Sequence, residues 1–471
     1  MTLFPMKNFL FFLFSFLLYI CAPFNYSYYY CVFVLLIYCM QWLLFSYKFH
    51  SMLGIFHFSN LFCLSYLVAN FVYPVFVHPY YPSGLVMHDF NEDFISRGVA
   101  LAQLGSNCFF WGIDIVLTPK KSSYNREIKT LMKENDCIDL FSRLLFFCYA
   151  MLILLLGAIS YDFYNAFFER FITLVSFIFL FFTLTTISRT ILKKEQIQES
   201  FFSFCIVNKW MMLCLFLVVL GLGRIGDRGP IIQYALTVFT IYALLVKRIN
   251  YKILTLCVII GVAFMVVVRN SRADGQYQSS MERREIKYGT KLPFFLDACV
   301  DLMASTRCMY VGMELTEGGN YLYGQSFIKP VLSPFPFLPT LFSSLLFNST
   351  PSELSTSAIL TEATKDRLGR EELEGVGTNC IVDIYMNAGL LGVVMIMFLL
   401  GRWVGLVEIR KQNSIYYLFC YCIMISYSIY MPRSTIFDFM RPTIWGCLLI
   451  YIRNNTPNRF KKNHEISFVY K

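Results

Sequence analysis

Two arginines stand in a short polar segment between apolar stretches. Arg224 and Arg228 lie within residues 223–230, and Pro230 suits the first turn of a following helix. The unpaired N–H groups at a helix start attract anions, and forked guanidinium donors bind phosphate oxygens. The segment therefore predicts a site for a phosphate-containing group. The alternative is a tight turn in which Asp227 pairs with an arginine and both arginines contact lipid headgroups.

Further arginines border two later apolar stretches. Arg269 and Arg272 follow one stretch, and Arg433 and Arg441 flank a short polar segment near the end of the chain. An arginine at an apolar border can simply extend to the lipid headgroups, and Asp438 can pair with a neighbouring arginine. Otherwise these arginines complete a ring around an anionic group at one membrane surface.

Asp383 is an acidic residue inside an apolar environment. It lies with Tyr385 and Asn387 at the start of a long apolar stretch. A charge facing lipid costs at least about 2.5–3.5 kcal/mol, so we expect Asp383 to face protein or a water-filled cavity. If the chemistry needs a general base, Asp383 and Glu374 are the candidates. The cysteine and histidine spacing predicts no metal site, and we expect no cofactor.

The composition places these groups in a membrane protein. The chain has 471 residues, of which 57% are hydrophobic and only 15% charged, whereas a soluble domain is about 25% charged. The mean hydropathy is +0.56. A soluble enzyme, a disordered chain and a disulfide scaffold are therefore excluded. The net charge of +10 indicates membrane orientation rather than binding to nucleic acid.

The apolar stretches predict an all-α polytopic membrane protein with about 12 transmembrane helices, since one span needs about 20 apolar residues. The expected spans are residues 8–24, 28–47, 52–77, 97–117, 141–160, 171–187, 201–222, 230–246, 253–268, 381–400, 415–430 and 443–452. Residues 1–268 would hold helices one to nine, 269–380 a long loop, 381–452 the last three helices and 453–471 a basic tail.

The short loops predict an orientation. With twelve spans, the loops rich in lysine and arginine all fall on one side, which is the cytoplasmic side. Both termini join that side, and the membrane is the inner, cytoplasmic membrane. The loop 269–380 is then extracytoplasmic, where two of Cys299, Cys308 and Cys380 could pair in an oxidising compartment.

The long loop has a pattern of its own. Between Phe295 and Met313 apolar residues recur near helical spacing, with Asp297, Asp301 and Ser305 on the other face. This spacing predicts an amphipathic helix lying on the membrane surface. Four prolines at residues 330–339 follow among Phe and Leu and predict a broken apolar turn in the interface.

Two short motifs resemble the O-antigen polymerase and ligase superfamily. Gly-Asp-Arg-Gly at residues 226–229 is similar to that superfamily's Gly-Ser-Arg-Gly loop. Thr378-Asn379, followed by Gly389-x-x-Gly392, resembles the ligase pattern of His-Asn, ten residues and Gly-x-x-Gly. Thr378 stands where ligases carry their histidine, which favours an oligosaccharide repeat-unit polymerase of the Wzy type. The similarity covers roughly residues 200–450, including the single long loop.

This resemblance implies a GT-C-type glycosyltransferase. It would join repeat units carried on undecaprenyl pyrophosphate into O-antigen or capsular polysaccharide at the periplasmic face. The family's pyrophosphate-holding arginines correspond to Arg228 and, more loosely, to Arg224 and Arg269. Expected partners are the lipid-linked oligosaccharide and membrane lipid, with a chain-length regulator and a flippase as further ones. An O-antigen ligase or another GT-C glycosyltransferase is the first alternative. A flippase is the second, and it would need mid-membrane polar groups and pseudo-symmetric halves.

Overall fold

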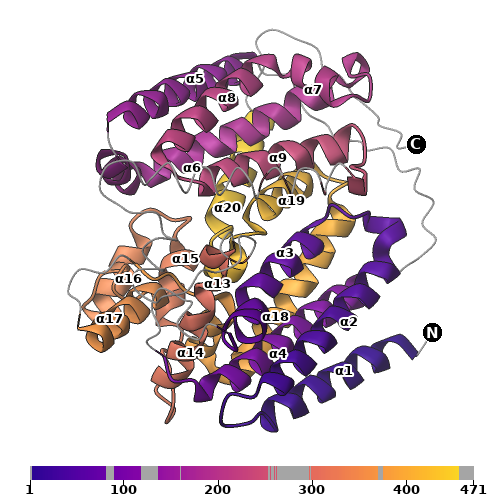
Figure 1. Ribbon diagram of the computed structural model, residues 1–471. Helices are drawn as coiled ribbons and strands as arrows, with labels where there is room; N and C mark the ends of the chain where they lie inside the picture. The colour runs from indigo at the N-terminus through magenta and orange to yellow at the C-terminus, as the bar shows by residue number, and fades with distance from the viewer. Residues whose placement is uncertain are drawn as a thin grey trace.

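The computed structural model describes residues 3–80, 90–117, 136–159, 161–252, 299–369 and 375–455, together with the single positions 255, 259, 261 and 296. Within these ranges every regular element is a helix (Figure 1), so the all-α prediction is confirmed there. Eleven of the twelve expected apolar stretches coincide with helices. The stretch 253–268 lies outside the described ranges.

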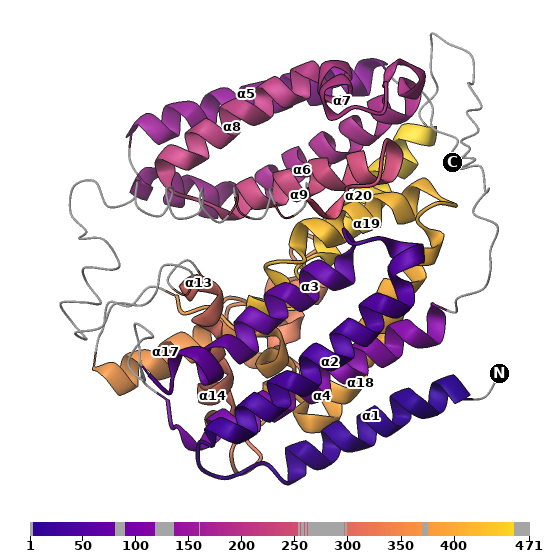
Figure 2. The same ribbon diagram turned by 45° about the vertical axis from the view of Figure 1, so that its right-hand side comes forward.

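A first group of helices is built around α4. Its members are α1 (Leu3–Ile20), α2 (Tyr28–Leu53), α3 (Phe58–Leu67), the π-helix η1 (Val68–Val77), α4 (Asp93–Val116) and α18 (Cys380–Arg410). Helix α4 contacts α1, α2, η1 and α18, and most of its side chains are buried. Figure 2 shows these helices running side by side. Helix α4 therefore forms the core of this group.

Glycines bring α4 and α18 into backbone contact. A Cβ atom on Gly112 would lie 2.1 Å from the carbonyl oxygen of Phe398, and one on Gly401 would lie 2.0 Å from that of Phe109. Neither position has room for a side chain. Small residues at such crossings let membrane helices approach closely, where packing rather than the hydrophobic effect drives their association.

A second group stands beside the first. It contains α5 (Asp136–Ile159), α6 (Tyr161–Leu192), α7 (Phe201–Val207), α8 (Lys209–Ile225) and α9 (Gly229–Leu245). Two further helices, α19 (Ile415–Tyr427) and α20 (Met440–Asn455), lie between the groups (Figures 1 and 2). Helix α19 packs on α9, α3 and α18, and α20 packs on α19 and α6. They join the two groups into one body.

The expected span 201–222 is broken into two helices. Residues 201–222 form α7 and α8, which meet at an angle of 98°. Asn208 stands at the break, where its side-chain amide donates to the Phe204 carbonyl (3.1 Å) and to the Thr190 hydroxyl of α6 (3.2 Å). The prediction of a continuous helix here is wrong, because a buried asparagine forms side-chain bonds that compete with a straight helix.

The long loop folds into short helices. They are α13 (Val300–Met303), α14 (Ser305–Leu315), the 3₁₀-helix η4 (Gln325–Phe327), α15 (Ile328–Leu332), α16 (Leu338–Phe347) and α17 (Thr356–Leu368). Helix α14 is buried from Ser305 to Met313 and packs on α4, α17 and α18. The prediction that this segment lies on the membrane surface is wrong for α14, because its polar side chains find partners within the protein. Arg307, for example, donates to the Thr364 hydroxyl (3.3 Å).

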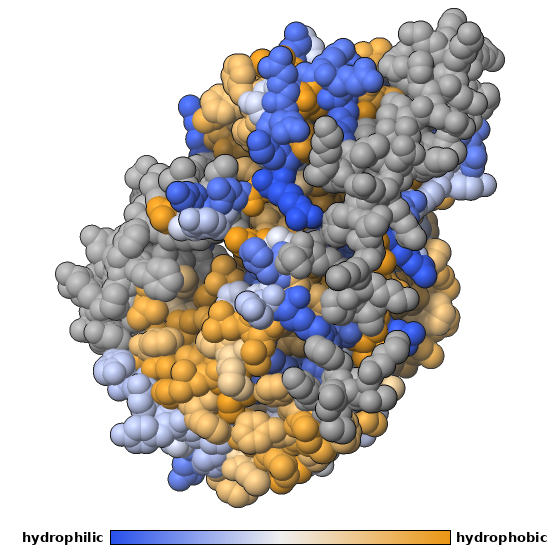
Figure 3. Space-filling model, turned by 90° about the vertical axis from the view of Figure 1, so that its right-hand side faces the viewer, coloured by the Kyte–Doolittle hydropathy of each residue, from blue (hydrophilic) through white to orange (hydrophobic). Residues whose placement is uncertain are grey.

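The outer surface suits a lipid environment. Among the described residues, six helices are long and apolar enough to cross a membrane, or seven if the bent α7–α8 pair counts as one span. Figure 3 shows apolar residues gathered broadly over the lower part of the face that it displays. The chain is therefore a multi-pass membrane protein, and the full set of twelve spans stays a prediction.

Candidate functional site

Asn379 fixes the start of α18. Its side-chain oxygen accepts a hydrogen bond from the Ile381 N–H (3.0 Å), which caps the helix, and its amide donates to the Asn70 side chain of η1 (3.0 Å). An asparagine cap satisfies a backbone donor that the helix itself leaves free. The chain that returns from the long loop is thereby anchored, and Asp383 follows in the first turn.

Helix α18 breaks at Gly389, whose φ of +62° is readily accessible only to glycine. The Met386 carbonyl accepts a hydrogen bond from the Leu322 N–H (2.7 Å). The Asn387 amide donates both to the Asp383 carbonyl (2.7 Å) and to the Ser326 hydroxyl (2.6 Å). The break therefore docks η4 and the residues before it against the first turns of α18.

Asp383 faces protein, as the sequence predicts. Its side chain is 2% exposed. One carboxylate oxygen accepts hydrogen bonds from the Ser326 hydroxyl (3.0 Å) and from the Thr356 hydroxyl at the start of α17. Asp383 thus holds two segments of the long loop against the membrane helix.

A second carboxylate lies near the first but remains open to solvent. Asp438 belongs to the short segment between α19 and α20, where the residue reaches solvent although protein packs around its carboxyl group. Desolvation by the surrounding protein, aided by the negative charge of Asp383, raises the pKa of Asp438 to about 6. Ser434, Arg441 and Lys329 act in the opposite direction. Carboxylates and cations from α15, α18 and α20 therefore converge here.

Arg441 sits at the junction of the two helix groups. Its guanidinium donates to the Ser176 hydroxyl of α6 (3.3 Å) and lies 5.5 Å from the Trp445 ring. That ring stacks on Phe177 with centroids 4.3 Å apart. Arg433, in the 3₁₀-helix η5 (Met431–Arg433), is half-buried, and its side chain forms no hydrogen bond or ion pair with the described residues. Arg441 can therefore bind an anion beside Asp438.

Arg224 and Arg228 lie in the second helix group. They flank the turn between α8 and α9, where Gly226 has a φ of +83°. The Asp227 carboxylate accepts a hydrogen bond from the Gly229 N–H (3.2 Å), so it already occupies one donor of the α9 start. No described hydrogen bond or ion pair joins this turn to Asp383. Arg269, Arg272 and Glu374 lie outside the described residues.

Because ligases carry a histidine, the positions of Thr378, His78 and His88 bear on that alternative. Of these, the described residues His78 and Thr378 are both buried. His78 is buried, bonds through Nδ1 to the Tyr73 hydroxyl (3.2 Å) and packs edge-on against the Tyr26 ring. Thr378 is buried next to the Asn379 cap. His88 lies outside the described ranges.

The three cysteines in or beside the long loop do not form disulfides with one another: Cys299, Cys308 and Cys380 are all free thiols.

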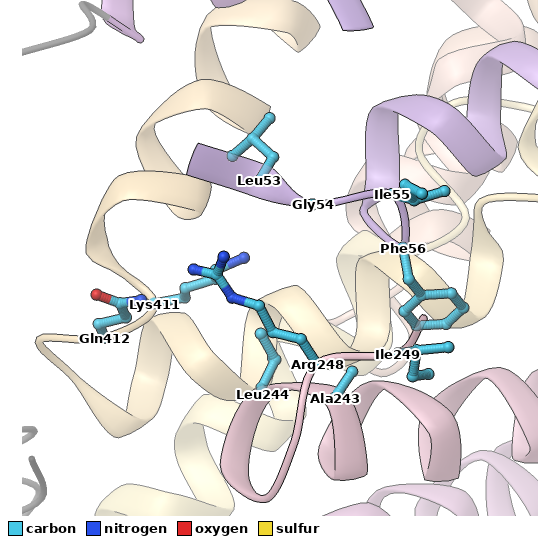
Figure 4. A pocket seen from close by; sticks show the side chains of 10 residues that line it. All are labelled: Leu53, Gly54, Ile55, Phe56, Ala243, Leu244, Arg248, Ile249, Lys411 and Gln412. Carbon is cyan, nitrogen blue, oxygen red and sulfur yellow. The ribbon is translucent and has the colours of Figure 1, made fainter. Parts of the chain in front are cut away.

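A small cavity lies at the opposite end of α18. It encloses about 60 Å³, and Arg248 and Lys411 are among the residues that line it (Figure 4). Lys411 already pairs with Glu408 and lies 3.9 Å from the Tyr421 ring centroid. The cavity lining includes no carboxylate, so among the described residues the cavity lacks the pairing of acidic and basic groups found near Asp438.

Three residues of the site had no sequence signal. All three belong to the long loop. Its docking brings Ser326 and Thr356 to Asp383 of α18 and brings Lys329 to Asp438. Asp438 had a partial signal, since it stands between Arg433 and Arg441.

Comparison with known proteins identifies a family for the chain. The family model for O-antigen polysaccharide polymerase Wzy matches residues 6–457. No curated protein and no solved structure matches the chain.

Proposed function

Because the chain belongs to the O-antigen polysaccharide polymerase Wzy family, we propose that the cluster around Asp438 and Arg441 is where it joins repeat units. Polymerisation of O-antigen repeat units is the activity of the family, and the match covers nearly the whole chain. The observation that carries the proposal is the meeting of two carboxylates, Asp383 and Asp438, with two cations, Lys329 and Arg441.

The donor is proposed to be a growing chain on undecaprenyl pyrophosphate. Nucleotide sugars and ATP are cytoplasmic, so a donor used at the periplasmic face must already be borne by the membrane. The basic short loops support an arrangement in which both termini are cytoplasmic and the long loop is periplasmic. Helix α1 begins and α20 ends toward the same side of the molecule (right in Figure 2), which fits termini on one side of the inner membrane.

The proposed step is a single displacement. A sugar hydroxyl of one lipid-linked unit attacks the anomeric carbon of the growing chain, and the bond from that carbon to the pyrophosphate oxygen breaks. Asp438 accepts the hydroxyl proton, because its carboxylate is open to a substrate while Asp383 is buried and already accepts two hydroxyls. Arg441 and Arg433 stabilise the charge that develops on the leaving pyrophosphate.

The remaining arginines can act on the same substrate. Arg441 contacts α6, so the site faces the second helix group, which also carries Arg224 and Arg228. We propose that these two, with Arg269 and Arg272, guide or hold the pyrophosphate. A chain-length regulator and a flippase are proposed partners.

We expect Arg441→Ala to shorten or abolish the O-antigen ladder. Loss of one positioned donor to developing charge costs roughly 10²–10³-fold in rate. Arg441→Lys should restore activity only in part, because lysine keeps the charge but not the forked donor. The measurement is ladder length on gels after complementation of a deletion strain, with membrane amounts checked by immunoblot.

The matched control for Arg441 is Arg410→Ala. Arg410 is exposed at the far end of α18, and among the described residues its side chain donates to the Tyr417 hydroxyl (2.8 Å). It should leave the ladder intact. A full ladder from Arg441→Ala protein in normal amount would remove Arg441 from the site.

Deletion of the gene tests the function itself. Loss of the ladder, with survival of core capped by a single repeat, is the expected polymerase result. Loss of capped core, with long polymer stranded on the carrier lipid, would instead indicate a ligase. Repeat units trapped at the cytoplasmic face would indicate a flippase.

A further inference from the structure

The long loop carries an apolar surface on α16 that the described part of the chain leaves exposed. Helix α16 packs chiefly on α15, and Ser343 is its single buried residue. In a membrane protein exposed apolar residues commonly face lipid, so the place of this cluster in the fold, rather than its exposure, is the informative feature. The α16 surface consists of Phe335, Phe337, Leu341, Phe342, Leu345 and Leu346, which are between 42% and 86% exposed.

This α16 surface begins beside the proposed active site. The Trp445 indole N–H donates to the Pro334 carbonyl (2.7 Å), and the same ring lies next to Arg441. Lys329, which acts on Asp438, belongs to α15, the partner of α16. Helix α15 in turn contacts α20. Figure 1 shows α16 lying outward from α15 and α20. The surface therefore extends away from the cationic cluster and is fixed to it by a hydrogen bond.

We propose that the α16 surface binds the polyprenyl chain of the lipid-linked substrate while Arg441 and Arg433 bind its pyrophosphate. The inference rests on the proposed function. A lipid with an anionic headgroup and a long apolar tail requires cations next to an apolar surface. Here Arg441 and Lys329 lie next to the α16 surface. Helix α16 has 10 residues, about 15 Å of axis, so it meets only the isoprene units nearest the pyrophosphate.

Position distinguishes the polyprenyl chain from other occupants. A helix that only contacts bilayer acyl chains does not need a fixed position relative to Arg441. Helix α16 has such a position, because the hydrogen bond from Trp445 to Pro334 holds the start of its segment next to Arg441. The neighbouring Lys329 and Arg441 also match an anionic lipid, whereas a second copy of this basic chain would bring like charge.

The test compares donors that share a repeat unit and differ in tail length. The purified full chain would be assayed with units on undecaprenyl pyrophosphate and on a two-isoprene pyrophosphate. The variant is Leu341→Ser with Leu345→Ser, two exposed positions on one helix face. Leu140→Ser with Leu144→Ser on α5 has the same spacing, is also exposed and serves as the control.

We expect the variant to raise KM for the long-chain donor about tenfold or more. KM for the short-chain donor and kcat for both should stay unchanged, and the control pair should behave as the native chain. Equal effects on both donors would indicate contact with bilayer lipid alone, and a change in oligomeric mass would indicate a second copy. Either result, or no effect, overturns the inference and leaves the proposed function standing. If the native chain elongates neither donor, the proposed function itself fails.

Discussion

Replacement of Asp438 by asparagine should eliminate the O-antigen ladder while the protein still reaches the membrane in normal amount. Asparagine has the shape of aspartate but cannot accept the proton of the attacking hydroxyl. General base catalysis contributes about 10²–10⁴-fold to a rate. The residue reaches solvent, so the exchange should disturb folding little. Gel profiles and immunoblots of a complemented deletion strain measure both quantities.

The pH dependence gives the same carboxylate a second signature. Its surroundings raise the pKa of Asp438 to about 6. Below that pH the carboxyl group is protonated and cannot act as a base, so the elongation rate should rise through pH 6 and level off above it. Initial rates measured between pH 4.5 and 8 would show the rise, and the residual rate of Asp438→Asn should lack it.

Asp383→Asn is the informative comparison. The asparagine introduced there would keep a side-chain oxygen able to accept the hydroxyl hydrogen bonds that Ser326 and Thr356 donate to Asp383. We therefore expect a smaller loss than for Asp438→Asn. A normal ladder from Asp438→Asn, combined with none from Asp383→Asn, would transfer the base to Asp383.

Most helices could be predicted because a long apolar stretch is by itself enough to indicate a membrane-spanning helix. Eleven expected stretches are helices, including the stretch 381–400, which lies in α18 and carries Asp383. The errors arose where polar side chains form tertiary bonds. The Asn208 side chain bonds to Thr190 of α6, where the expected span 201–222 breaks. The buried Arg307 side chain donates a hydrogen bond to Thr364. These hydrogen bonds join residues that are far apart in the sequence, so the local spacing of apolar residues does not reveal them.

The site was predictable where a residue conflicts with its neighbours in sequence. Asp383 stands in an apolar stretch, and Arg441 starts another. Ser326 and Thr356 are polar residues beside other polar residues, so the sequence does not single them out. In the folded structure their hydroxyl groups donate hydrogen bonds to Asp383, beside the break at Gly389. The sequence thus indicates the charged side chains that stand in or beside apolar stretches. Their hydrogen-bond partners become apparent only in the folded structure.

The backbone contact between α4 and α18 makes Gly401→Ala the most damaging small substitution that we expect. The added Cβ would lie 2.0 Å from the Phe109 carbonyl oxygen and 2.9 Å from its carbon. Both are backbone atoms, so no side-chain rotation relieves the overlap and the helices must separate. Overpacking of this kind costs typically about 1–3 kcal/mol. Fluorescence-detected size exclusion after stepwise heating should show less folded protein and a lower melting temperature.

Gly223→Ala supplies the control, because a Cβ there meets nothing within 4 Å. In a helix, alanine is favoured over glycine by roughly 0.5–1 kcal/mol, so this exchange in α8 should leave stability unchanged or raise it. The two identical substitutions should therefore act in opposite directions. If Gly401→Ala melted like Gly223→Ala, the close approach of α4 and α18 would be wrong. The placement of Asp383 against the long loop would then need another support, because α18 carries it.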